Sequence, residues 1–188
     1  MIGAMLSGIG NGQQAAAETL FTRVTDAPRL GQPWLGQGGS YGGVMRGLDG
    51  HPDYHLIVPT DPAAHIQEII WGPTDHKVEG ATSDWDGLAN TKALASDSKA
   101  HPAAEWAASL RIEDGDNVFT DLYLPSQREA RLLSSTVPEL FTSGWHWTST
   151  QYSAHNAWVQ HFSDGHQGCS GEGSSWQARA VRRIPIIG

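Results

Sequence analysis

The sequence predicts an α+β fold with two main helices and short antiparallel strands, preceded by an amino-terminal helical arm. Helical patterns occupy residues 84–133 in the middle of the chain, and residues 145–184 alternate between apolar and polar positions as strands do. Helices followed by a run of short strands are typical of domains in which helices cover an antiparallel sheet. One domain with an appendage also suits a chain of 188 residues.

An amphipathic helix is predicted over residues 13–25. Two roles stay open for its apolar face: packing back onto the same domain, or docking on another subunit of a larger assembly. We predict that this face docks on another subunit. Residues 1–40 would then form an attachment arm, and residues 41–188 would form the folded domain. The face is formed by residues at positions i, i+3, i+4 and i+7 of the helix, namely Ala17, Leu20, Phe21 and Val24.

The stretch Pro28–Gly43 is rich in Gly, Pro and Gln and is predicted to be a linker or an irregular arm. Residues 44–47 and 54–58 then have the composition of two strands of a β-hairpin. The apolar run that follows is ambiguous between helix and strand. We predict a strand over residues 67–71, because a Gly-Pro pair ends the run directly afterwards.

Residues 84–95 and 102–110 are predicted to be helical, since their apolar residues recur at helical spacing and a proline occupies the first turn of the second segment. A turn is predicted at Glu113–Asn117. Another helix begins at Pro125-Ser126, where the serine suits the N-cap position. Glu129 lies three residues further on and would complete a capping box.

Three strands are predicted in the last fifth of the chain, over residues 145–150, 157–162 and 174–184. Within residues 145–150 the aromatic residues alternate with polar ones, as in a sheet that presents aromatic and polar side chains on one face. Residues 163–165, Ser-Asp-Gly, supply a tight turn. Residues 168–175 are Gly- and Ser-rich, contain the only cysteine and are predicted to be a loop.

Several motifs in this half of the chain occur in a defined order. Residues 145–150 read W-H-W-T-S-T, residues 156–165 read N-A-W-V-Q-H-F-S-D-G, and residues 179–182 read R-A-V-R. Upstream, residues 122–133 read L-Y-L-P-S-Q-R-E-A-R-L-L. Together these motifs resemble the Lcl-type C-terminal domain family of bacterial and phage proteins, over roughly residues 85–185. The resemblance implies a C-type-lectin-like fold.

Composition excludes several classes of function. A net charge of −8 argues against a nucleic-acid partner, which needs clustered Lys and Arg. A single cysteine excludes an internal disulfide framework and fits assembly in a reducing cytoplasm. The amino terminus lacks the basic residues and the long apolar run of a signal peptide, and no stretch is apolar enough to insert into a membrane. We therefore expect a protein made in a bacterial host cytoplasm.

Three kinds of chemistry are weighed and set aside. The lectin tripeptides that bind calcium are absent from the expected place, and Asp114, Asp116 and Asn117 are interpreted as a solvated turn. The four late histidines match no compact metal motif. Formylglycine-generating enzymes share the fold class, but their chemistry needs cysteines poised near a metal, and Cys169 is alone. The prediction is a protein without cofactor, metal or enzymatic activity.

Binding by surface is the function that remains, because stiff aromatic side chains mixed with small polar ones favour recognition. The resemblance extends to receptor-binding tips of phage tail fibres, including trimeric proteins that retroelements diversify. We predict a phage tail-associated protein of the virion, in which a homotrimer binds a bacterial glycan, pilus or outer-membrane protein and the arm binds other tail proteins. A structural tail component and a bacterial adhesin stay open as alternatives. Trp158 and Phe162 are expected to be buried, and the receptor-binding residues are predicted to be Trp145, His146, Gln151, Tyr152, His155, Asn156, His161, His166, Gln167 and Trp176.

Overall fold

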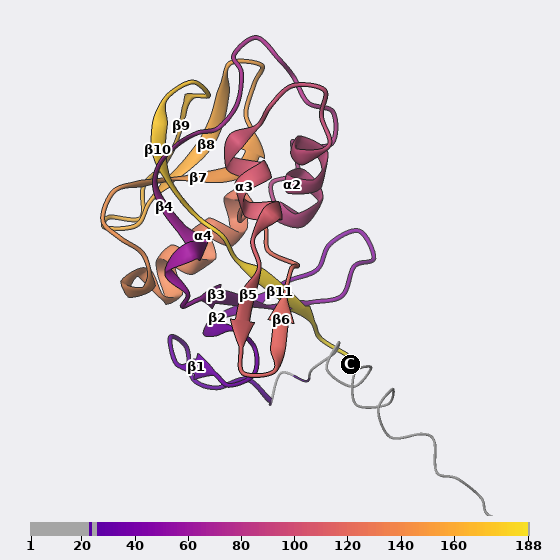
Figure 1. The fold of residues 1–188 in the computed structure, drawn as a ribbon, viewed down its shortest axis with the longest axis vertical. Coiled ribbons are helices and arrows are strands. Elements are labelled where there is room, and N and C mark those ends of the chain that lie inside the picture. Colours follow the sequence, from indigo (N-terminus) through magenta and orange to yellow (C-terminus); the bar gives the residue numbers. More distant parts are fainter. Residues whose placement is uncertain (1–22, 24–25, 188) are drawn as a thin grey trace, which may run out of the picture.

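The computed structural model describes residue 23 and residues 26–187 (Figure 1). This part of the chain has an α+β fold, mostly sheet with three α-helices, as the sequence predicted. The predicted helix over residues 13–25 lies outside the described residues, except for Arg23. Its assembly face, Ala17, Leu20, Phe21 and Val24, is therefore not described.

A four-stranded sheet is built from the early part of the chain and its last strand, in the order β1-β2-β3-β11. The predicted hairpin is confirmed, since β2 and β3 pair in antiparallel fashion across a loop. The predicted linker was wrong over its second half, where β1 and most of β2 lie. Edge-to-face packing of Trp34 on Tyr41 fixes these two strands together. The strands are β1 (Pro33–Trp34), β2 (Gly39–Met45), β3 (Tyr54–Pro59) and β11 (Arg182–Pro185).

A five-stranded sheet has the order β4-β10-β7-β8-β9 and carries most of the predicted binding residues. The strand β10 lies between β4 and β7, antiparallel to the first and parallel to the second. The remaining neighbours, β7 with β8 and β8 with β9, are antiparallel. The strands are β4 (His65–Ile70), β7 (Trp145–Gln151), β8 (Asn156–His161), β9 (Gln167–Gly171) and β10 (Ser175–Arg179).

Two predictions for the last part of the chain, a loop over residues 168–175 and a strand over residues 174–184, need correction. The Gly/Ser-rich stretch after residue 167 is the edge strand β9, because its small residues pair with every residue of β8 from Asn156 to Gln160. The segment 174–184 is two strands in different sheets. The chain leaves the five-stranded sheet after Arg179 and joins the four-stranded sheet at Arg182, as the yellow end of the ribbon shows in Figure 1.

The helices form near the predicted positions. They are α2 (Gly87–Ala95), α3 (Pro102–Ser109) and α4 (Gln127–Thr136), with 3-10 turns η3 (Pro62–Ala64) and η4 (Pro138–Leu140) and a small hairpin of β5 (Ile112–Asp114) and β6 (Asn117–Phe119). The predicted capping box is confirmed. The hydroxyl of Ser126 accepts the backbone N–H of Glu129, and the Glu129 carboxylate accepts the backbone N–H of Ser126.

Two large clusters of buried side chains hold the layers together. One cluster includes Trp71, Leu94 and Trp147 and joins the five-stranded sheet to α2 and α3. The other includes Leu56 and Leu133 and joins the four-stranded sheet to α4. Burial of apolar surface on this scale is the main stabilising contribution to a fold. Within the described residues, no helix has the length and apolar character needed to cross a lipid bilayer.

Candidate recognition face

Aromatic side chains form a row across one face of the five-stranded sheet. The ring of Trp145 is the nearest neighbour of the Cβ position of Gly168 on β9, and Trp176 donates its indole N–H to Ser170, two residues further along that strand. Residues two apart on a strand share a face, so both tryptophan rings lie over the same face of β9. Both rings also pack against the same buried cluster. Trp145 in turn pairs with His161 of β8. We call the row Trp176, Trp145 and His161 the recognition face.

The row extends to the edge of the sheet. The backbone N–H of His161 donates to the carbonyl of His166 at 2.8 Å, at the turn that joins β8 to β9. Asp164 lies at the same turn, with its Oδ1 2.8 Å from Nδ1 of His161 and 3.6 Å from Nδ1 of His166. The backbone N–H of His166, followed by the His161 ring, lowers the pKa of Asp164. The carboxylate of Asp164 and the imidazoles of His161 and His166 thus lie together at one end of the recognition face.

The rings of the recognition face are fixed rather than free. Trp145 packs on His161 with ring centroids 4.9 Å apart and planes at 61°. Trp176 donates its indole N–H to the hydroxyl of Ser170 on β9 at 2.8 Å. Beneath them Trp147 is almost fully buried, and its indole N–H donates to the carbonyl of Ile69 at 2.9 Å. Trp145 and Trp176 are half-buried over this support, so part of each ring faces outward.

Two of the predicted receptor-binding residues are buried, which corrects the prediction. His146 is 2% exposed and lies on the opposite face of β7, where its ring packs edge-on against Phe141 and Phe162. Burial lowers its pKa to about 4, so the ring is neutral at ordinary pH. Gln151 is 3% exposed, and its side-chain amide is already paired inside the protein, where it donates to the His76 carbonyl and to Glu172. Neither side chain is available to a partner.

The other predicted residues lie away from the recognition face. Tyr152 is exposed and packs edge-on against Trp158, with ring centroids 5.4 Å apart. Trp158 is half-exposed, contrary to prediction, because it points to the face opposite Val159 and pairs with the exposed Cys169. Phe162 is buried, as predicted.

Three more predicted residues lie at the two ends of β8. His155 is exposed, with Nδ1 2.9 Å from a carboxylate oxygen of Asp75. Asn156 is half-buried at the start of β8. Gln167 is half-buried and donates its side-chain N–H to the carbonyl of Gln127 at 2.7 Å. The ten predicted residues therefore divide among the three of the recognition face, His166 at its end, two buried residues and four scattered positions.

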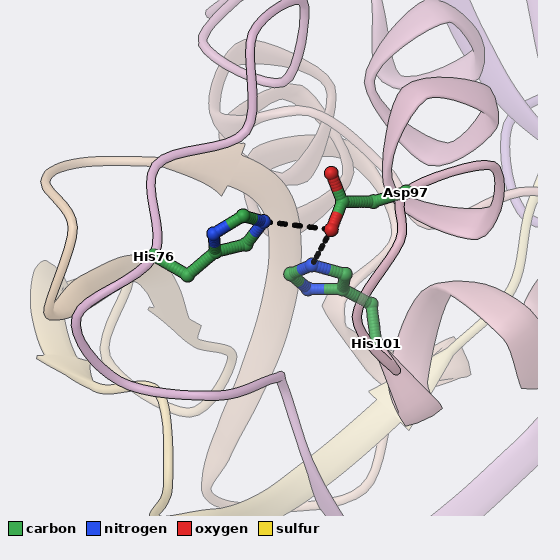
Figure 2. Close-up of side chains that lie close together, drawn as sticks. All are labelled: His76, Asp97 and His101. Atoms are coloured by element: carbon green, nitrogen blue, oxygen red, sulfur yellow. Dashed lines mark hydrogen bonds and ion pairs between the residues drawn. The ribbon is translucent and has the colours of Figure 1, made fainter.

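A second constellation, which the sequence analysis missed, joins His76, Asp97 and His101 (Figure 2). It lies beside α3, where His101 occupies the N-cap position. The sequence offers one signal for it, the four-residue spacing from Asp97 to His101, which places their side chains close together at the start of a helix. His76 comes from a distant loop, and nothing in the sequence links it with the other two.

No family model matches the chain, and no curated protein matches it in sequence. The geometry of the recognition face and of the His76 cluster therefore carries the functional argument.

Proposed function

We propose that this protein is a phage tail-associated receptor-binding protein with a C-type-lectin-like fold, and that it binds a bacterial surface receptor through the recognition face. The observation that carries the proposal is the gathering of Trp176, Trp145 and His161 on one face of the five-stranded sheet. Binding hot spots are enriched in aromatic residues of this kind, clustered at the centre of an interface.

The support beneath the rings favours recognition over a purely structural role. Trp145 and Trp176 are already held by His161 and Ser170, so little conformational freedom is lost when a partner covers them. Indole rings bind the apolar faces of sugar rings and of aromatic side chains, and they offer large contact area at low entropic cost. The carboxylate of Asp164 and the ring of His166 add polar groups at one end of the row.

Multivalent display would strengthen such a site. A shallow face with few anchors gives weak binding at one copy, and linkage of several copies in a symmetric assembly multiplies the apparent affinity. We therefore propose a trimer on the virion, with residues 1–40 as the part that attaches to other tail proteins. The proposed activity is binding rather than catalysis.

Binding to whole bacteria tests the proposal. Fluorescently labelled protein is incubated with a panel of bacterial strains, and bound protein is measured by flow cytometry for the native chain and for Trp145→Ala and Trp176→Ala. We expect a strain-selective signal that both variants lose. Tyr152→Ala is the matched control, because Tyr152 is an exposed aromatic residue outside the row.

Two results would contradict the proposal. Equal binding by the native chain and both tryptophan variants would place any recognition elsewhere. Absence of binding to every strain, together with burial of the recognition face against a neighbouring tail protein in assembled particles, would favour the structural role instead.

A further inference from the structure

The side chains of His76, Asp97 and His101 converge on one point from two segments of the chain, the loop that contains His76 and the connection between α2 and α3 (Figure 2). Nε2 of His76 lies 2.7 Å from Oδ1 of Asp97, and Nε2 of His101 lies 3.6 Å from the same oxygen. One potential ligand atom from each residue lies within 4.8 Å of the other two. We propose that these three residues form a binding site for one Zn²⁺ ion, separate from the recognition face.

The burial of His101 is an independent indication of a ligand. Its side chain is fully buried, and neither ring nitrogen has a hydrogen-bond partner among the described residues. A buried polar group without a partner is costly, and native structures rarely leave one. Nε2 faces the carboxylate of Asp97 from beyond hydrogen-bond distance. An ion between the two atoms satisfies the imidazole and neutralises the carboxylate.

The three residues are held in place by their surroundings. The backbone of His76 donates its N–H to the carbonyl of Ala154 at 3.1 Å and accepts the amide of Gln151 at 2.7 Å. Asp97 accepts the backbone N–H of Lys99 at 2.9 Å. The ring of His101 is fixed edge-on against Trp71, with centroids 5.4 Å apart. Such support outside the ligands orients metal-binding side chains in known sites.

The donor set selects the type of ion. Two imidazoles and one carboxylate suit zinc, whereas calcium and magnesium prefer oxygen ligands alone. Ligands of a tetrahedral zinc ion lie roughly 3.3 Å apart, given bond lengths near 2.05 Å. The pair His101–Asp97 is already close to this separation, and the pair His76–Asp97 has to open by about half an ångström. Both members of that pair are partly exposed, so they have room to move.

The site has an open side. The side chains of His76 and Asp97 are 21% and 18% exposed, whereas the side chain of His101 is fully buried on the inner side of the site. Three protein ligands with an open fourth position leave a coordination site for water or for a donor group of a ligand. The proposed ion is thus accessible from solvent at the edge of α3.

Zinc titration of the untagged full chain tests the site. Isothermal titration calorimetry with ZnCl₂ gives the stoichiometry and the affinity for the native protein, for His76→Ala and for Asp97→Asn. We expect one ion per chain, and a loss of affinity of at least roughly 10-fold in each variant. Substitution of Co²⁺ for Zn²⁺ gives a second readout, because imidazole and carboxylate ligation changes its visible absorption.

His166→Ala is the matched control, since His166 is an exposed histidine beside a carboxylate at another place on the surface. We expect it to bind zinc as the native protein does. Circular dichroism confirms that each variant is folded, and the buried His101 is left unchanged for that reason. Absence of zinc binding by the native chain, affinity unchanged in both site variants, or loss of binding in the control would each overturn the proposal.

Discussion

The carboxylate of Glu129 accepts a hydrogen bond of 2.8 Å from the hydroxyl of Tyr123 in the fully buried interior. The same oxygen accepts the hydroxyl of Tyr54, while the other oxygen completes the capping box of α4. Burial raises the pKa of Glu129, and these hydrogen bonds oppose the shift. A single side chain thus joins the start of α4 to the four-stranded sheet.

Replacement of this side chain should destabilise the protein strongly. Glu129→Ala leaves the hydroxyl of Tyr123 and the backbone N–H of Ser126 without their partner, and each unsatisfied buried group is costly. The hydroxyl of Tyr54 loses one of its two acceptors and keeps the carbonyl of Trp85. We expect the free energy of unfolding to fall by roughly 3 kcal/mol. Urea denaturation followed by circular dichroism measures the change. Glu68→Ala, at an exposed position of β4, should have little effect, and an equal loss in both variants would contradict this account.

Alanine at position 72 should also destabilise the fold, for a steric reason. A Cβ on Gly72 would collide with the imidazole ring of His101, which is buried and has no room to withdraw. Overpacking of this kind costs roughly 1–3 kcal/mol. Thermal unfolding of Gly72→Ala measures the loss. Gly173→Ala is the control, because a Cβ there meets its nearest neighbour at an ordinary contact distance of 3.9 Å.

Acid should weaken the fold through His146. The pKa of this ring is lowered from 6.5 to about 4, chiefly by burial, with smaller contributions from the nearby His65 and Arg179. Between these two pH values the unfolded chain binds a proton that the folded chain does not, so the free energy of unfolding falls as the pH falls from 6.5 to 4. Below pH 4 this residue contributes no further loss. The full contribution is roughly 3 kcal/mol.

The variant His146→Gln tests this pH dependence by removing the titrating ring. Urea midpoints measured across the same pH range should fall less steeply for the variant than for the native protein. His166→Gln is the control, since that ring is exposed. A native slope retained in His146→Gln would show that other histidines, such as the buried His55 and the half-buried His65, account for the acid sensitivity.

The tryptophans of the recognition face should dominate affinity for a receptor. Truncation of a central aromatic residue commonly raises Kd at least roughly 10-fold. We expect Trp145→Ala and Trp176→Ala each to reach this value once a receptor is in hand, measured by surface plasmon resonance. Both rings pack partly on Trp147, so circular dichroism must show that each variant is folded.

Local sequence signals predicted the elements whose stability is local. The capping box at Ser126 and Glu129 was visible because both halves of it lie within four residues. The strands β7 and β8 were visible because their aromatic and polar residues alternate. The strand β9 was missed, because its glycines and serines have low strand propensity and it forms only through pairing with β8.

Long-range contacts decided what the sequence could not show about the sites. His146 and Gln151 look like surface residues by type, but Phe141 and Phe162 pack on His146, and the His76 loop binds Gln151. The recognition face depends on the pairing of β7 with β8 and on the contacts of Trp145 and Trp176 with β9, which no local pattern encodes. His76 meets Asp97 and His101 only because the folded loop brings them together.

The insertion of β10 between β4 and β7 has a consequence for biosynthesis. Until residues 175–179 leave the ribosome, β4 and β7 have no common neighbour, and the four-stranded sheet still lacks β11. Neither sheet has all of its strands during most of translation, so the nascent chain carries unpaired strand edges that favour aggregation. Premature termination ahead of this segment would therefore yield a product for degradation rather than a smaller working domain.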